Sequence, residues 1–251
     1  LDDREADFNK IVGHLRYFLY KDGALVQQKV ISDFTKAVRP SYTFDLMNLE
    51  YGEYKMVVVA NSTKTALTGD PANADNLVIT FPGAADTEDF FTAVFPFTVN
   101  TNDIKEYEVG LLRTHGVIRY TFNNMPSDVS GIEVLMQKVS HEKWVTGDYM
   151  NECEASQRYT LLPLGKRAAD EDYVIGTFPS LTNQKSAYYL HMYRNNEDVP
   201  YMRQLITDTL TVTRNQLLDI AVTFNNGNLS FEIDLDSDWN GSSSGGETGL
   251  E

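Results

Sequence analysis

Five residues near the C-terminus have the spacing of a calcium-binding loop. Asp236, Asp238, Asn240, Gly241 and Glu247 match the pattern D-x-D-x-N-G-x5-E at every defined position. Carboxylate and amide oxygens would surround the ion, and the last glutamate would bind it with both oxygens. However, the motif follows a predicted strand instead of a helix, and ordering its SSSGG stretch costs conformational entropy. We therefore predict no cofactor and an acidic flexible tail, with Ca²⁺ as the alternative.

Residues that support nucleophilic catalysis are few and scattered. The sequence contains no nucleophile elbow, no Gly-rich phosphate loop and no HExxH zinc motif, because His141-Glu142 has no second histidine after it. Histidines occur only at four distant positions: His14, His115, His141 and His191. We therefore predict no catalytic residue and no enzyme. A triad assembled in space, or a hydrolase that uses paired carboxylates, stays open as an alternative.

Cys153 is the only cysteine of the chain. A single cysteine cannot form an internal disulfide, and it cannot build a cysteine-based metal site. Its neighbours are acidic, which disfavours the reactive thiolate. We interpret Cys153 as a structural or incidental thiol, and its role stays open.

The charge of the chain excludes several classes of partner. The 251 residues carry a formal net charge of −15, whereas nucleic-acid-binding proteins normally present a basic surface. Direct binding to an anionic membrane is disfavoured for the same reason. No apolar run approaches 18 residues, so no segment is predicted to span a bilayer. The start, LDDREADFNK, is not a signal peptide and fits a mature or trimmed chain.

The elements that would position these residues are predicted to be strands, because apolar residues mostly recur at every second position. Lys21-Asp22-Gly23 predicts a hairpin turn between LRYFLY and ALVQQKVI. Tyr42, Phe44 and Leu46 alternate with polar residues and predict a further strand. Residues 54–60 are nearly all apolar, which is typical of an interior strand.

The C-terminal hairpin has the clearest pattern in the chain. Asn226-Gly227, the strongest short-range signal for a hairpin, separates LLDIAVTF from LSFEIDL. Each run has one apolar and one polar face, as a half-buried sheet requires. We expect an ordinary edge strand here, and the alternative is an edge that accepts a strand from a partner.

A central stretch, EYEVGLLRTHGVIRYTFNNMP, divides the chain into two halves. We expect strands on either side of His115-Gly116 to open a second domain. The predicted organisation is all-β, with an N-terminal β-sandwich over residues 1–105, a C-terminal β-sandwich over 106–240 and a flexible tail over 241–251.

Several segments, in order, resemble the fimbrillin-associated anchor proteins of Bacteroidales, which belong to type V pili. In the first half they are LRYFLYKDGALV and the run from Gly52-Glu53-Tyr54 to Ala60-Asn61. In the second half VGLLRTHGVIRYTFNNMP is similar to the opening of the family's second domain, with Leu111 and Arg113 at matching positions. The closing strands and the final tryptophan, Trp239, also resemble the family.

This resemblance implies two tandem transthyretin-like antiparallel β-sandwich domains and a non-enzymatic role as an anchor, minor or tip subunit in fimbrial assembly and cell adhesion. It implies partners among other fimbrial subunits, joined by β-strand addition, and surface ligands of host or bacterial origin. It also implies a place at the cell surface, in the outer membrane or fimbrium of a Gram-negative bacterium. Family members are lipoproteins held by an acylated N-terminal cysteine, which this chain lacks because it begins at Leu1. The residues do not separate anchor, shaft and tip roles.

A carbohydrate-binding surface protein is the second interpretation. It rests on the aromatic residues, in particular Trp144, Trp239, Tyr188, Tyr189 and Tyr193. Aromatic residues on strands usually belong to the core, so they do not by themselves define a glycan site.

Overall fold

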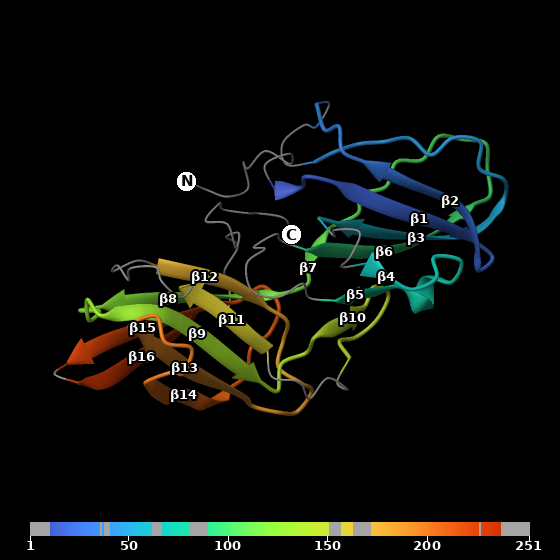
Figure 1. Ribbon diagram of the computed structural model, residues 1–251. Coiled ribbons are helices and arrows are strands. Elements are labelled where there is room, and N and C mark those ends of the chain that lie inside the picture. The colour runs from blue at the N-terminus through green and yellow to red at the C-terminus, as the bar shows by residue number, and fades with distance from the viewer. Residues whose placement is uncertain are drawn as a thin grey trace.

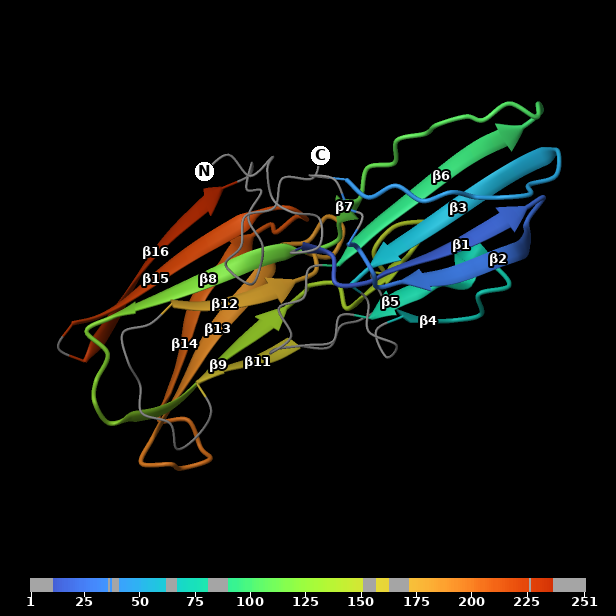
Figure 2. The same cartoon turned by 90° about the horizontal axis from the view of Figure 1, so that it is seen from above.

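The computed structural model describes residues 11–35, 37, 41–61, 67–80, 90–150, 157–162, 172–225 and 227–236. These residues form sixteen strands and one short 3-10 helix, Ala74–Asn76, which confirms the all-β class. The strands make four sheets, arranged as two layered groups that lie end to end (Figures 1 and 2).

The first group combines a five-stranded sheet with a three-stranded sheet. The larger sheet has the order β2-β1-β3-β6-β7, with strands β1 (Leu15–Lys21), β2 (Ala24–Ile31), β3 (Gly52–Ala60), β6 (Phe91–Val99) and β7 (Leu112–Arg113). The smaller sheet has the order β10-β5-β4, with strands β4 (Leu67–Thr68), β5 (Val78–Thr80) and β10 (Glu142–Trp144). The predicted Asp-Gly turn joins β1 to β2, and its two residues have the positive φ angles, 49° and 84°, that a tight hairpin needs.

The second group is a sandwich of two four-stranded sheets. One sheet has the order β11-β9-β13-β14, with strands β9 (Val129–Gln137), β11 (Gln157–Leu162), β13 (Ser186–Arg194) and β14 (Met202–Leu210). The other has the order β12-β8-β15-β16, with strands β8 (Gly116–Asn123), β12 (Asp172–Thr177), β15 (Leu217–Asn225) and β16 (Asn228–Asp236). Neighbouring strands are antiparallel except β8 and β15, which are parallel.

Strand β3 occupies the interior position that its apolar sequence predicts, between β1 and β6. Its alternate residues face two cores. Val57 and Val59 belong to a cluster that continues through the smaller sheet into the second group, where it includes Ile118 and Ile220. Met56 and Val58 belong to a separate cluster on the other face of the five-stranded sheet. One hydrophobic core therefore extends across both halves of the chain.

Residues 42–46 do not form the predicted strand. The segment is extended, and its alternation is real, because Tyr42, Phe44 and Leu46 pack against the second cluster. The Phe44 ring stacks on that of Tyr17, with centroids 5.1 Å apart. The segment covers the face of the sheet instead of lying beside an edge, so its backbone joins no ladder. Period two predicted an amphipathic extended chain correctly, but it does not specify a backbone partner.

Strand pairing crosses the predicted domain boundary twice. Leu112–Arg113 was expected to open the second sandwich, but β7 pairs with Phe91 and Thr92 of β6 in the first group. Strand β10 comes from the second half and pairs with β5 of the first. Both exchanges depend on long-range contacts, which local sequence patterns do not contain. His115-Gly116 is thus the point where the chain passes from one group of sheets to the other.

The connection after β10 ties the two groups together. Val145 is buried, and its N–H donates to the Leu77 carbonyl at 2.9 Å. The Tyr149 hydroxyl donates to the Thr114 carbonyl, and the Tyr149 ring contacts that of Phe178 edge-on. We call residues 142–150 the clasp.

Among the described residues, no helix reaches the length and apolarity needed to cross a bilayer.

Candidate functional site

Several sheet edges of the described structure are short or irregular. Strand β2 has a register shift opposite Leu19 and Tyr20, and β14 has two shifts along its pairing with β13. Strands β4 and β10 contain two and three residues. Bulges and short lengths discourage an edge from pairing with another chain.

The outer edge of β6 is interrupted by a proline. The Thr114 N–H donates to the Phe90 carbonyl at 2.9 Å, so even-numbered residues of this chain segment direct their backbone groups outward. Pro96 is one of these even-numbered residues, and it has no N–H that could donate outward. Proline on an edge strand usually occupies such an outward-facing position. Tyr107 also lies against Phe95 and Phe97, with ring centroids 5.2 and 5.6 Å away. The β6 edge is therefore poorly suited to accept a strand.

Strand β16 has a long and regular edge. Its nine residues pair with β15 without a register shift, from Asn228 opposite Asn225 to Asp236 opposite Leu217. The predicted hairpin forms, and Gly227, the described residue of its turn, has the positive φ, 86°, that a tight turn needs. Strand β16 contains no proline or lysine and lies at the end of its sheet, with no strand beyond it in the described part of the chain.

The apolar residues of β16 direct their backbone groups toward the open edge. A two-residue turn makes Asn225 and Asn228 a hydrogen-bonded pair, and hydrogen-bonded and non-hydrogen-bonded pairs then alternate along the ladder. The residues of β16 in non-hydrogen-bonded pairs are Leu229, Phe231, Ile233 and Leu235. Their side chains lie on the inner face but are only partly covered, and Leu235 is 48% exposed. An additional strand would satisfy these backbone groups and cover this apolar surface.

The solvent face beside this edge is acidic. Arg119 of β8 binds Asp219 of β15 through two hydrogen bonds of 2.6 and 2.7 Å, and this bonding raises the pKa of Arg119. Asp219 in turn lies opposite Asp234 of β16, and Ala221 lies opposite Glu232. Glu232 and Asp234, together with Asp236 at the end of the strand, are therefore the outermost charges of the sheet face. This row could not be predicted from the sequence, because the parallel pairing of β8 with β15 has no local signal.

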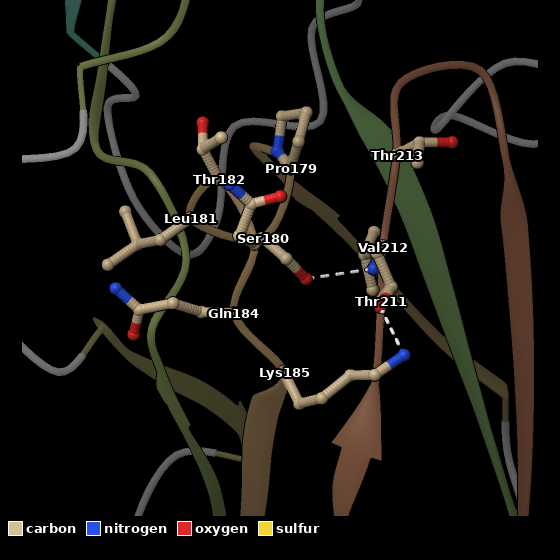
Figure 3. A pocket seen from close by; sticks show the side chains of 10 residues that line it. Pro179, Ser180, Leu181, Thr182, Gln184, Lys185, Thr211, Val212 and Thr213 are labelled. Carbon is tan, nitrogen blue, oxygen red and sulfur yellow. Dashed lines mark hydrogen bonds between the residues drawn. The ribbon is translucent and has the colours of Figure 1, made fainter.

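A shallow pocket of about 440 Å³ lies at one end of the same sandwich (Figure 3). The loop after β12 and the chain after β14 form its walls, joined where the Val212 N–H donates to the Ser180 hydroxyl at 2.9 Å. Lys185 closes the lower side by donating to the Thr211 hydroxyl at 2.8 Å. Hydroxyl, amide and aliphatic groups dominate the lining, which consists of Pro179, Ser180, Leu181, Thr182, Asn183, Gln184, Lys185, Thr211, Val212 and Thr213. No carboxylate lines this pocket, so it does not supply paired acids.

The predicted calcium loop is placed only in part. Asp236 is the exposed last residue of β16. Asp238, Asn240, Gly241 and Glu247 lie outside the described residues, as do Cys153, Trp239 and the predicted tail. Within the described residues, no group of three or more His, Cys, Asp or Glu side chains has a geometry that could hold a metal ion. The calcium hypothesis stays a prediction.

The other residues singled out in the sequence lie mostly in the core. Arg113 is buried, and its guanidinium carbon lies 5.5 Å from the centroid of the Phe91 ring. One of its Nη atoms also donates to the Asn215 amide oxygen at 3.4 Å. Tyr188 is a fully buried core residue, and Tyr193 is buried and donates to Glu133 at 2.5 Å. Trp144 is 39% exposed. These aromatic residues do not form a common platform, because Tyr188 faces the inside of its sheet.

Comparison with known families decides the relationship that the sequence suggested. The family model of the fimbrillin-A associated anchor proteins Mfa1 and Mfa2 matches residues 2–243. The chain belongs to this family. The protein is therefore a component of fimbriae, as the sequence resemblance implied. No curated protein matches it.

Solved structures share the fold of this family member at low sequence identity. The tip fimbrial protein Mfa3 from Porphyromonas gingivalis, truncated at its C-terminus, is 13% identical, with a TM-score of 0.54 over 92% of this chain and 96% of that one. A fimbrial assembly protein from Parabacteroides distasonis is 12% identical, with a TM-score of 0.53 over 92% and 94%. A candidate polysaccharide-binding protein from Bacteroides thetaiotaomicron is 10% identical, with a TM-score of 0.61 over 92% and 91%.

Proposed function

We propose that this protein is a non-enzymatic fimbrial subunit at the cell surface that joins a neighbouring subunit by β-strand addition at β16. The observation that supports this is the edge of β16, which has no strand beyond it among the described residues, is nine residues long and unbulged, and presents partly covered apolar residues. In strand addition, main-chain hydrogen bonds supply affinity and alternate side chains supply register. The family of fimbrial anchor proteins supports a role as a structural subunit.

The place of the protein in the fimbrium is part of this proposal. Its family supports an anchor, minor or tip position, with the protein outside the cell and tethered to the outer membrane by a lipid on the natural precursor. Mass spectrometry of the protein isolated from its native membrane tests the tether. If the N-terminus is unmodified and the protein is released from the cells without detergent, the anchor role is excluded. The other subunit roles then remain.

A proline in β16 tests the strand-addition step. Leu235 directs its N–H outward, so Leu235→Pro removes one donor from the open edge and leaves the β15 ladder intact. Leu235→Ala is the matched control, because it removes the same side chain but keeps the N–H. Immunogold labelling of fimbriae should show Leu235→Pro largely absent and Leu235→Ala present. Equal incorporation of the two variants would show that β16 is not the assembly edge.

Carbohydrate binding is a second candidate function, favoured by the pocket of Figure 3. Its hydroxyl, amide and ammonium groups are the kinds of group that hydrogen-bond to sugars, and one protein of similar fold is described as a candidate polysaccharide binder. A glycan array probed with the wild type and with Lys185→Ala tests this candidate. Binding that Lys185→Ala does not change would place any glycan elsewhere.

A further inference from the structure

We infer that the β16 edge selects partner strands in which apolar residues alternate with basic residues, and that Glu232 and Asp234 prevent two copies of this chain from pairing through β16. This inference rests on the proposed function, because it names the chemistry of the strand that β16 would accept.

The pairing of β16 with β15 fixes the geometry of the next strand. Glu232 and Asp234 form hydrogen-bonded pairs with β15, so they would form non-hydrogen-bonded pairs with a strand added on the other side. In antiparallel sheets these pairs bring Cα atoms to about 4.5 Å, closer than in hydrogen-bonded pairs. Side chains opposite Glu232 and Asp234 would therefore contact them directly.

Side chains opposite Glu232 and Asp234 would face uncompensated negative charge. Asp219 is already bound by Arg119, and the row continues outward to Asp234 with a second negative charge. Neither Glu232 nor Asp234 forms an ion pair with any described residue, and both are exposed. Opposite charges stabilise a cross-strand pair and like charges destabilise it. A strand with lysine or arginine at these positions would complete the row.

The inner face of β16 is apolar. Phe231 and Ile233 are only partly covered and Leu235 is exposed, so the residues of the partner strand between its basic positions should be apolar. The same arrangement opposes self-association. If two β16 strands paired in an antiparallel manner, acidic residues of one copy would lie near acidic residues of the other, in a sheet that would otherwise be continuous and apolar inside.

Three synthetic peptides test the selection on the full chain. Each has nine residues with valine at alternate positions, and the intervening residues are lysine, threonine or glutamate. Fluorescence anisotropy at low salt should show the lysine peptide binding about tenfold tighter than the threonine peptide, because two favourable pairs replace two neutral ones. The glutamate peptide should bind most weakly, because both of its pairs are repulsive. The preference should shrink in 1 M salt, since exposed charges are screened.

Charge reversal supplies the control. Glu232→Lys with Asp234→Lys should invert the order of the three peptides. Glu197→Lys with Asp198→Lys changes the net charge equally on the connection between β13 and β14, in the opposite sheet, and should leave the order unchanged. Equal binding of the lysine and threonine peptides would overturn the charge selection while strand addition survives. Failure of all three peptides would overturn strand addition at β16 as well.

Self-association tests the second half of the inference. The wild type should sediment as a monomer, whereas Glu232→Thr with Asp234→Thr should form a concentration-dependent dimer. Adding Leu235→Pro to that variant should restore the monomer, because it removes an outward donor from the edge. A neutral variant that stays monomeric, or a dimer that survives Leu235→Pro, would contradict a protective role of the two acids.

Discussion

Arg119 and Asp219 face each other across the parallel strands β8 and β15, although 100 positions separate them in the sequence. The Nε atom of Arg119 lies 2.6 Å from Oδ1 of Asp219, and Nη2 lies 2.7 Å from Oδ2. This planar two-bond contact is the strongest geometry available to an arginine–carboxylate pair. It links the two strands on their solvent face, directly beside the acidic edge of β16.

Replacing Asp219 with asparagine should have a small effect that depends on salt. Both side chains are more than a third exposed, so we expect a loss of about 0.5–1 kcal/mol in the free energy of unfolding at low salt and less in 1 M salt. A double-mutant cycle with Arg119→Gln, measured by urea denaturation, isolates the pair. A coupling energy of zero at low salt would show that the contact does not stabilise the fold.

Tyr20 should make the protein sensitive to alkaline pH. Burial, reinforced by the charges of Asp70 and Asp75, raises the pKa of Tyr20 to about 12, and its hydroxyl donates to the Pro71 carbonyl at 2.8 Å. Between pH ~10, where an unfolded tyrosine ionises, and pH ~12 the unfolded state holds fewer protons, so stability falls as pH rises.

Tyr20→Phe tests this pH dependence. The variant should lose about 1 kcal/mol at pH 7 through the missing hydrogen bond, and its stability should fall less steeply above pH 10. Tyr107→Phe, at a half-exposed ring, is the control. Urea denaturation at a series of pH values measures both effects. Identical slopes for the wild type and Tyr20→Phe would contradict the assignment.

Gly69 and Gly227 both have positive φ angles, of 97° and 86°, but only Gly69 is crowded. A Cβ atom at Gly69 would lie 1.8 Å from the Asn76 carbonyl oxygen, whereas no atom lies within 4 Å of the corresponding position at Gly227. Gly227→Ala should therefore cost about 1 kcal/mol for the backbone conformation alone. Gly69→Ala should cost at least about 3 kcal/mol, because the backbone must also move. Equal thermal midpoints for the two variants would rule out the close approach.

The clasp should make the two halves unfold together. Val145 is 2% exposed and belongs to the core that spans both groups of sheets. Val145→Ala should lower the free energy of unfolding by about 2 kcal/mol, and calorimetry of the wild type should show a single transition. Val199→Ala, at a residue that is 62% exposed, should change stability by less than about 0.5 kcal/mol. Two separate transitions in the wild type would mean that the halves are independent.

Local features of the fold followed from the sequence where local chemistry decides them. Both predicted hairpins form, and Asp22, Gly23 and Gly227 have the positive φ angles of tight turns, which these residue types tolerate. The apolar run of β3 predicted an interior strand, and the alternation in β16 predicted a half-buried one. Each of these inferences depends on residues within a few positions of one another.

The predictions that were wrong depend on contacts between residues that are distant in the sequence. Tyr42, Phe44 and Leu46 have strand periodicity but lie on the face of a sheet, and Leu112–Arg113 joins the sheet of the first half instead of the second. The candidate site was predicted from the sequence only in part. The hairpin was identified as an edge, but the acidic row beside Arg119 was not, because it requires β8 and β15 to be parallel neighbours.

The amino-acid sequence alone determined the all-β class, the two tight hairpins and the resemblance to a fimbrial family, because turn chemistry, side-chain periodicity and motif order are properties of neighbouring residues. The tertiary structure decided which strands pair, where β7 and β10 cross between the halves, and that β16 is the last strand of its sheet among the described residues, with an acidic edge. Those features depend on backbone hydrogen bonds and burial between residues as much as 100 positions apart, and local pattern does not encode the choice of such partners.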